Sequence, residues 1–232
     1  MSVAEKLTTI AKNEQKVFDA GKQAEYDAFW DAYQDKGKRT AYAGAFYGVG
    51  WTDESFKPKY DLVVVENVSS MFRQNQITNI KQSLENAGVV LDFSKSKQFD
   101  YVFYGAPTVA IPHIDCSGLY ANQPLSYSFA GCSNLKEVSI YVRDDLKYSN
   151  VFQNCTALEN LTIEGVIGQN GFDVSWSTKL THDSLMSIIN ALQDKSTDTS
   201  GTAWVITLGS ENCAKLTDAE ILLAEQKGWV VE

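Results

Sequence analysis

The chain has 232 residues, a formal net charge of −9 and 44% hydrophobic residues. This length allows one large domain or two small ones, and the apolar fraction is ordinary for a protein that buries a core. The acidic excess disfavours binding to nucleic acid and to anionic membrane surfaces, because both require clustered Lys and Arg. Acidity of this kind mostly keeps a protein soluble.

The N-terminal sequence shows no signal-peptide pattern. Val3, Leu7 and Ile10 are separated by charged and polar residues, so they form no continuous apolar region. No stretch of the sequence approaches the ~20 apolar residues that span a bilayer. We therefore expect synthesis in the cytosol, no membrane insertion, and release by another route if the protein works outside the cell.

The first 36 residues predict a helix. Ser2 and Glu5 have capping-box spacing, and apolar residues follow at intervals of three and four up to about Gln34. Such a stripe can pack on the chain's own domain or on copies of itself. Its narrowness and its position ahead of the repeats favour self-association. We expect residues 1–36 to act as a tether or a homo-oligomerisation segment.

Aromatic residues crowd the end of this helix and the following segment, residues 37–60. Interleaved with Gly44, Gly48 and Gly50, they fit two interpretations: a sugar-stacking platform, or a compact plug that covers the first repeat. Repeat arrays need caps at their ends, which favours the plug. The aromatic residues are Tyr26, Phe29, Trp30, Tyr33, Tyr42, Phe46, Tyr47, Trp51 and Phe56.

One motif, Phe-x-x-Cys-x-x-Leu followed by a strand-like triplet, starts at Phe129 and again at Phe152. The interval of 23 residues (152 − 129) is typical of leucine-rich repeats, whose units bury their apolar faces by stacking on neighbours. Two of the four cysteines, Cys132 and Cys155, occupy equivalent positions in the motif. We expect them to be buried thiols, with a disulfide or a zinc site as the less favoured interpretation.

Apolar-polar-apolar triplets recur from residue 91 onward, and their central residues are 23 or 24 positions apart (115 − 92, 139 − 115, 162 − 139). Alternate side chains of a strand point to opposite faces, so the central side chains should point outward. Strands stacked at ~4.8 Å would align them in one column on a parallel sheet. This column is the expected ligand-binding surface. Its members are Asp92, Asp115, Ser139 and Thr162.

The repeats are expected to cover residues 61–175. The last of them is ambiguous, because Phe172–Ser175 has the texture of a repeat strand but follows Thr162 by too few residues for a full turn. A hairpin and a truncated repeat both remain open.

Residues 176–232 predict a helical cap on the same array. Thr181 is a candidate N-cap for a helix that buries Leu185 and its apolar neighbours. Thr217 and Glu220 form a second capping box. Strands are expected at 204–208 and 229–231.

The residues give little support for catalysis. His113 and His182 are the only histidines, too few for most zinc sites or catalytic triads. Asp92 and Asp115 invite comparison with a glycosidase pair, but an open sheet lacks the pocket that separates two carboxylate pKa values. Stacked carboxylates are also a weak calcium candidate. We therefore expect no enzyme activity, no cofactor and no resident metal.

The units at 129–140 and 152–163 resemble the BspA-like leucine-rich repeats of bacterial surface proteins. Two earlier units depart from the pattern, with Ala106 and Asn75 standing where Cys is expected. The head, residues 4–33, and the tail, residues 180–229, look like the version of this family that bacteriophages and prophages carry.

This resemblance implies an α/β fold: a leucine-rich-repeat solenoid with a parallel β-sheet, an N-terminal helix and a helical C-terminal cap. It also implies a non-enzymatic recognition or structural protein, virion-associated or host-recognising, whose partner is a protein or a cell-surface glycan. A cell-surface adhesin is the alternative within the same class. A carbohydrate-active enzyme using Asp92 and Asp115 is the alternative from another class.

Overall fold

A computed structural model describes residues 24, 44–48, 51–54, 56–58, 61–63 and 66–232. The chain divides into two units, Met1–Arg39 and Thr40–Glu232, and apart from Ala24 the described residues belong to the second. The expected tether helix of residues 1–36 lies outside the described residues. It stays a prediction.

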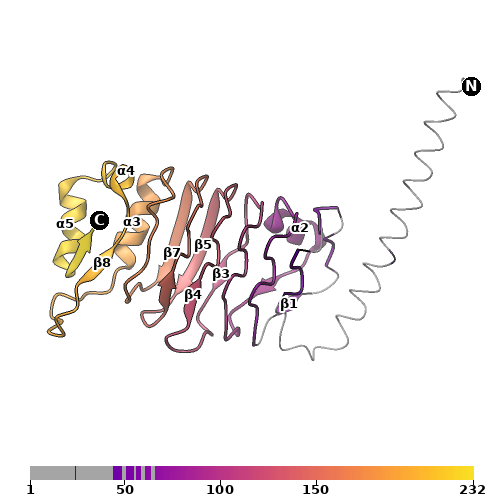
Figure 1. Cartoon of the computed structure of the whole chain (residues 1–232), viewed down its shortest axis with the longest axis horizontal. Coiled ribbons are helices and arrows are strands. Elements are labelled where there is room, and N and C mark those ends of the chain that lie inside the picture. The colour runs from indigo at the N-terminus through magenta and orange to yellow at the C-terminus, as the bar shows by residue number, and fades with distance from the viewer. Residues whose placement is uncertain (1–23, 25–43, 49–50, 55, 59–60, 64–65) are drawn as a thin grey trace, which may run out of the picture. The chain divides into compact units, whose positions relative to one another are not determined.

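The described part of the second unit is a mixed α/β structure in which short strands pair in parallel, as the sequence predicts (Figure 1). The paired strands are β1 (Leu62–Val63) with β2 (Leu91–Asp92); β3 (Ile114–Asp115) with β5 (Glu137–Val142), and β5 with β7 (Asn160–Gly165); β4 (Pro124–Ser126) with β6 (Lys147–Ser149); and β8 (Trp204–Ile206) with β9 (Trp229–Val231). The helices are α2 (Ile80–Ala87), α3 (His182–Ala191), α4 (Ser210–Cys213) and α5 (Asp218–Gln226). None of the described helices has the length and apolar character needed to cross a bilayer.

Strands β5 and β7 show the predicted repeat interval. They pair from Glu137–Asn160 to Val142–Gly165, a constant offset of 23 residues. Apolar side chains at alternate positions point into the core and are buried, while Ser139 lies opposite Thr162 on the outer face. The sequence correctly predicts this half of the outward column.

The other half of the predicted column is wrong. Asp115 pairs with Tyr141 and not with Ser139, so the outward alignment is broken between β3 and β5. Asp92 lies on β2, and no ladder joins β2 to β3 within the described residues. Ser139 and Thr162 therefore form one pair, and the two aspartates occupy separate strands.

An extra residue explains the altered register. The offset between the paired segments is 27 at the Ala110–Glu137 bridge and 26 at the Ile114–Ile140 pair. One residue is therefore absorbed between these points, next to Pro112, whose nitrogen carries no hydrogen for a ladder. The sequence triplets cannot reveal this bulge, because they mark alternation and not pairing.

Turns centred on buried phenylalanines stack beside the strands. The rings lie 5.4 Å apart between Phe72 and Phe103, 5.5 Å between Phe103 and Phe129, and 5.2 Å between Phe129 and Phe152. Interplanar angles of 5°, 7° and 4° make each pair nearly parallel. Phe46 extends the stack, with its ring centroid 5.0 Å from that of Phe72. We call these five turns the phenylalanine turns.

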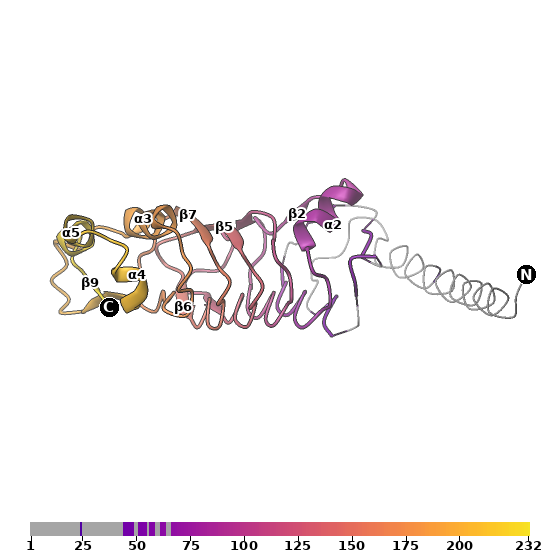
Figure 2. The same cartoon turned by 90° about the horizontal axis from the view of Figure 1, so that it is seen from above.

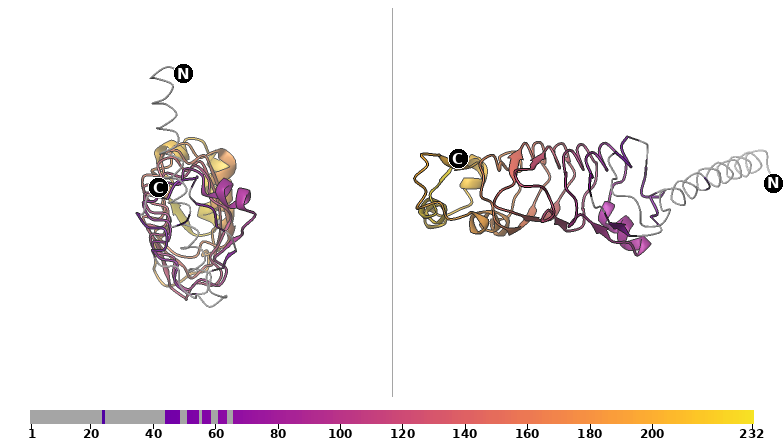
Figure 3. Two further views of the ribbon diagram at one scale, coloured as in Figure 1. Left: turned by 90° about the vertical axis from the view of Figure 1, so that its right-hand side faces the viewer. Right: turned by 90° about the horizontal axis from the view of Figure 1, so that it is seen from below.

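Each phenylalanine turn is bracketed by residues in the left-handed backbone conformation. Around Phe129 these are Tyr127, with φ of 53°, and Gly131, with φ of 75°. The N–H groups of all three residues donate to carbonyl oxygens of the next turn, around Phe152, at 2.7 to 3.0 Å. These bonds satisfy the buried backbone and offset the strain of a left-handed tyrosine. The bracketing pairs are Gly44 and Gly48, Ser70 and Gln74, Tyr101 and Gly105, Tyr127 and Gly131, and Asn150 and Asn154. Figure 3 (left) looks along this stack, and successive turns of the chain project onto one another.

The described aromatic residues of the segment 37–60 are largely covered. Phe46, Trp51 and Phe56 are buried, and Phe46 makes edge-to-face contacts with the other two rings at 5.6 and 5.2 Å. Phe56 also packs on Phe72, 5.7 Å away. Covered rings cannot stack on a sugar, so only Tyr47, which is 43% exposed, keeps the platform interpretation open here.

The repeat cysteines are core thiols, as predicted. Cys132 Sγ–H donates to the carbonyl oxygen of Phe103 at 2.9 Å, and Cys155 Sγ–H to that of Phe129 at 3.1 Å. All four cysteines are free. Burial raises the pKa of Cys132 to about 12 and raises that of Cys155 well above its ordinary value. The equivalent buried positions in the two earlier turns hold Ala106 and Asn75.

Helix α3 covers the free edge of β7, beside which it lies (Figure 2). The side chain of Thr181 caps it as predicted. The hydroxyls of Ser184 and Ser187 accept hydrogen bonds from the N–H groups of Leu161 and Ile163, at 2.9 Å each. A helix thus takes the place of the next strand and satisfies edge groups that would otherwise pair with another chain. The buried side chains expected on this segment are buried: Leu185, Ile188, Ile189 and Leu192.

The remaining C-terminal predictions hold, with one alternative removed. Thr217 and Glu220 form the capping box that opens α5. Asp173 makes a parallel bridge with Thr207, so the segment Phe172–Ser175 continues the parallel arrangement, and the hairpin alternative is wrong.

The phenylalanine stack can be tested with Phe129→Ala. Because Phe129 has a ring on each face, its truncation leaves a cavity, and we expect the free energy of unfolding to fall by about 3–5 kcal/mol. Guanidinium denaturation measures this loss. Leu222→Ala is the control, because Leu222 is 46% exposed on α5, and it should change the free energy by less than about 0.5 kcal/mol. Equal losses in the two variants would contradict the stack.

The thiols can be counted with Ellman's reagent. Cys116, Cys132 and Cys155 are buried, whereas Cys213 is partly exposed. Burial also raises the pKa of Cys116, which further slows its reaction. We expect Cys213 alone to react in the native protein and all four thiols to react in guanidinium without reductant. Fewer reactive thiols after unfolding would show a disulfide.

Candidate functional site

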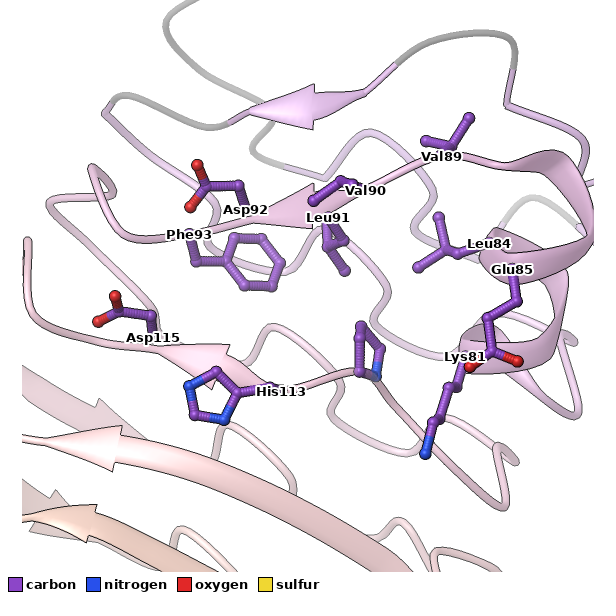
Figure 4. A pocket seen from close by; sticks show the side chains of 11 residues that line it. Lys81, Leu84, Glu85, Val89, Val90, Leu91, Asp92, Phe93, His113 and Asp115 are labelled. Atoms are coloured by element: carbon purple, nitrogen blue, oxygen red, sulfur yellow. The ribbon is translucent and has the colours of Figure 1, made fainter.

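A cavity of about 440 Å³ opens between β2 and β3, where the two sheets are not joined (Figure 4). Its walls are mainly apolar, and charged side chains stand around its rim. The lining residues are Lys81, Leu84, Glu85, Val89, Val90, Leu91, Asp92, Phe93, Pro112, His113 and Asp115.

Helix α2 creates this gap. Lys81 N–H still donates to the carbonyl oxygen of Ala110 at 3.2 Å, so the two neighbouring segments touch where the helix begins. The helix, capped by the Asn79 side chain and ended by Gly88 with φ of 64°, then leads the chain away from its neighbour. The chain returns as β2 too far from β3 to pair with it.

The cavity closes at its other end, at Gly118. A Cβ atom here would overlap the carbonyl oxygen of Ser94, so only glycine permits this approach of the two backbones. Lys97 Nζ donates to the Gly118 carbonyl oxygen at 2.9 Å. Arg143 holds the same loop by donating to the carbonyl oxygens on either side of Gly118, at 2.7 Å each. The gap is therefore a bounded pocket rather than an open groove.

Two of the four predicted site residues lie at the pocket rim. Asp92 and Asp115 both stand at the end away from α2 (Figure 4). Each carboxylate accepts a local backbone N–H through Oδ1: Asp92 from Ser94 at 2.8 Å, and Asp115 from Ser117 at 2.7 Å. These turns fix the aspartate side chains, and no hydrogen bond from a described residue reaches either Oδ2.

The other two predicted residues lie on the outer face of the sheet next to the pocket. His113, at the rim, has Nδ1 2.9 Å from Ser139 Oγ and 3.6 Å from Glu164 Oε1. Ser139 Oγ also donates to Glu164 at 3.4 Å, and Thr162 lies directly opposite Ser139. A short polar chain through His113 thus connects the sheet face with the pocket.

The charges at the rim are mainly acidic. Lys81 is neutralised by an ion pair of 2.8 Å with Glu137, a hydrogen bond that raises the pKa of Lys81. Glu85, Asp92 and Asp115 remain as rim carboxylates with no ion pair among the described residues. Nowhere in the described part of the chain do three or more His, Cys, Asp or Glu side chains group as metal ligands. The arrangement suits an apolar group with a neighbouring positive charge.

The sequence analysis misses α2 and the apolar wall of the pocket. A signal was present: Asn79 and Gly88 are good helix start and stop residues, and Ile80 and Leu84 lie four apart between them. The search for repeat strands passed over this stretch, because it departs from the repeat pattern.

Comparisons with known proteins add no family to this description. No protein-family model matches the chain, and no curated protein or solved structure matches it.

Proposed function

We propose that this chain is a non-enzymatic recognition module built as a leucine-rich-repeat solenoid, and that its pocket receives an apolar side chain of a partner protein. The observation that carries this proposal is the pocket itself, apolar on its walls and acidic at its rim. Stacked phenylalanine turns and strands offset by 23 and 26 residues support the solenoid.

The pocket has the features of a protein-interaction hot spot. Leu84, Val89 and Leu91 supply walls that can exclude water from an inserted aliphatic or aromatic group. Val90, 59% exposed, extends this apolar surface at the mouth. A Lys or Arg beside the inserted group would meet the free carboxylate oxygens of Asp92 and Asp115, which would set its orientation.

The biological setting of the proposal comes from the sequence resemblance. Residues 4–33 and 180–229 look like phage-borne and prophage-borne members of the BspA-like type, so we favour a virion-associated or host-recognition component. A bacterial cell-surface adhesin is the alternative, and cell fractionation separates the two. In both settings residues 1–36 would tether or oligomerise the module.

Val90→Glu tests the pocket as the binding site. A carboxylate at the pocket mouth adds charge beside an acidic rim, so we expect at least a tenfold loss of binding to phage particles or intact bacterial cells. Co-sedimentation of the labelled protein measures the bound fraction. Val230→Glu on β9 is the matched control, because Val230 is 51% exposed and far from the pocket lining. Wild-type binding by Val90→Glu, or equal losses in both variants, would refute the assignment.

Truncation tests the tether. We expect the full chain to form an oligomer and the chain lacking residues 1–36 to be a monomer, because the apolar stripe of this segment would pair between copies. Light scattering coupled to gel filtration gives both masses. A monomeric full chain would contradict the proposal.

A further inference from the structure

The outer side of the phenylalanine turns carries a patch of four tyrosines around one arginine. Three of its residues directly follow the ring of a turn: Tyr47, Arg73 and Tyr104. The other two, Tyr101 and Tyr127, are left-handed residues that precede a ring by two positions. Tyr47 is exposed and the other four are partly exposed. We call these five residues the tyrosine–arginine patch.

The stacked turns hold the patch in a fixed arrangement. The guanidinium carbon of Arg73 lies 5.3, 5.2 and 5.0 Å from the ring centroids of Tyr47, Tyr101 and Tyr104. The rings of Tyr101 and Tyr127 stack at 5.1 Å with an interplanar angle of 7°. Since the backbone beneath is a continuous hydrogen-bonded ladder, little ordering is left for a ligand to impose.

Arg73 has no anionic partner among the residues that the structure describes. Its Nε–H is buried and meets no acceptor there. The carboxylate of Asp100, next to Tyr101, accepts from Gln123 at 3.2 Å and forms no described ion pair with Arg73. In a chain of net charge −9, a guanidinium without a carboxylate is conspicuous, because a buried donor without an acceptor destabilises the fold.

We propose that the tyrosine–arginine patch binds a carboxylated saccharide. Contact with tyrosine rings uses the faces of a guanidinium, whereas a carboxylate pairs with the N–H groups in its plane, so both can occur at Arg73. The four tyrosine hydroxyls bond to no described residue and are available to sugar hydroxyls, while the rings offer apolar surface to the C–H groups of a pyranose.

Charge favours a saccharide over other anions. Nucleic acids carry a dense row of phosphates and need several clustered cations, whereas this patch has one. A sugar acid presents one carboxylate beside a large polar and partly apolar ring, which matches one guanidinium among four tyrosines. The inference goes beyond the proposed function: it concerns other residues and another ligand class, and it can hold whether or not the pocket binds a protein.

Titration calorimetry of the full chain with tetragalacturonate tests the proposal. The neutral methyl ester of the same tetrasaccharide is the matched ligand, because it keeps the sugars and removes the charge. We expect the acid to bind at least tenfold more tightly than the ester, since the ester cannot form the charge-assisted pair.

Variants locate the binding site. Arg73→Met should lose at least tenfold in affinity for the acid, whereas Tyr104→Phe, which keeps the ring beside Arg73, should lose about two- to tenfold. Lys136→Met removes one exposed positive charge away from the patch and should bind as the wild type does. Denaturation midpoints show whether each variant folds, and Tyr104→Phe tests the patch even if Arg73→Met does not fold.

Four results would overturn the proposal. They are absence of binding at millimolar acid, equal affinity for acid and ester, an equal loss in Lys136→Met, and tighter Arg73-dependent binding of a phosphoserine peptide than of the saccharide. The last would assign the patch to a phosphorylated protein instead.

Discussion

The stacking of one phenylalanine turn on the next is the constraint on which the described structure depends. Parallel rings 5.2 to 5.5 Å apart run from Phe72 to Phe152, and each turn donates its N–H groups to the next. The two interactions need one another. Ring stacking fixes the distance between turns, and the backbone bonds stabilise left-handed residues such as Tyr101 and Tyr127 that would be strained alone.

This shared register leaves the strand side of each repeat free to vary. Between β2 and β3 the chain inserts α2, loses the strand ladder and opens a pocket, while Phe72 and Phe103 remain stacked. A site can therefore form without breaking the array, because the phenylalanine turns carry the connection past it. The same turns place the tyrosine–arginine patch on their outer side, where a rigid backbone orders its side chains.

Repetition in the sequence predicts what repeats in the structure. The positions of Phe129 and Phe152, their cysteines and the pairing of Ser139 with Thr162 follow from a 23-residue interval. What deviates from the interval could not be predicted this way. The bulge at Pro112 shifts Asp115 opposite Tyr141, and α2 replaces a strand, since local packing and not periodicity decides both. The pocket lies where these two irregularities meet.

Backbone hydrogen exchange tests the stacking most directly. If the phenylalanine turns are hydrogen-bonded to one another, the N–H groups of Phe103, Phe129 and Gly131 should exchange only through global unfolding, as slowly as those of β5. The exposed loop 197–203 serves as the fast reference. Exchange of the turn amides at the rate of this loop would contradict the stacked arrangement, whatever the stability of the strands.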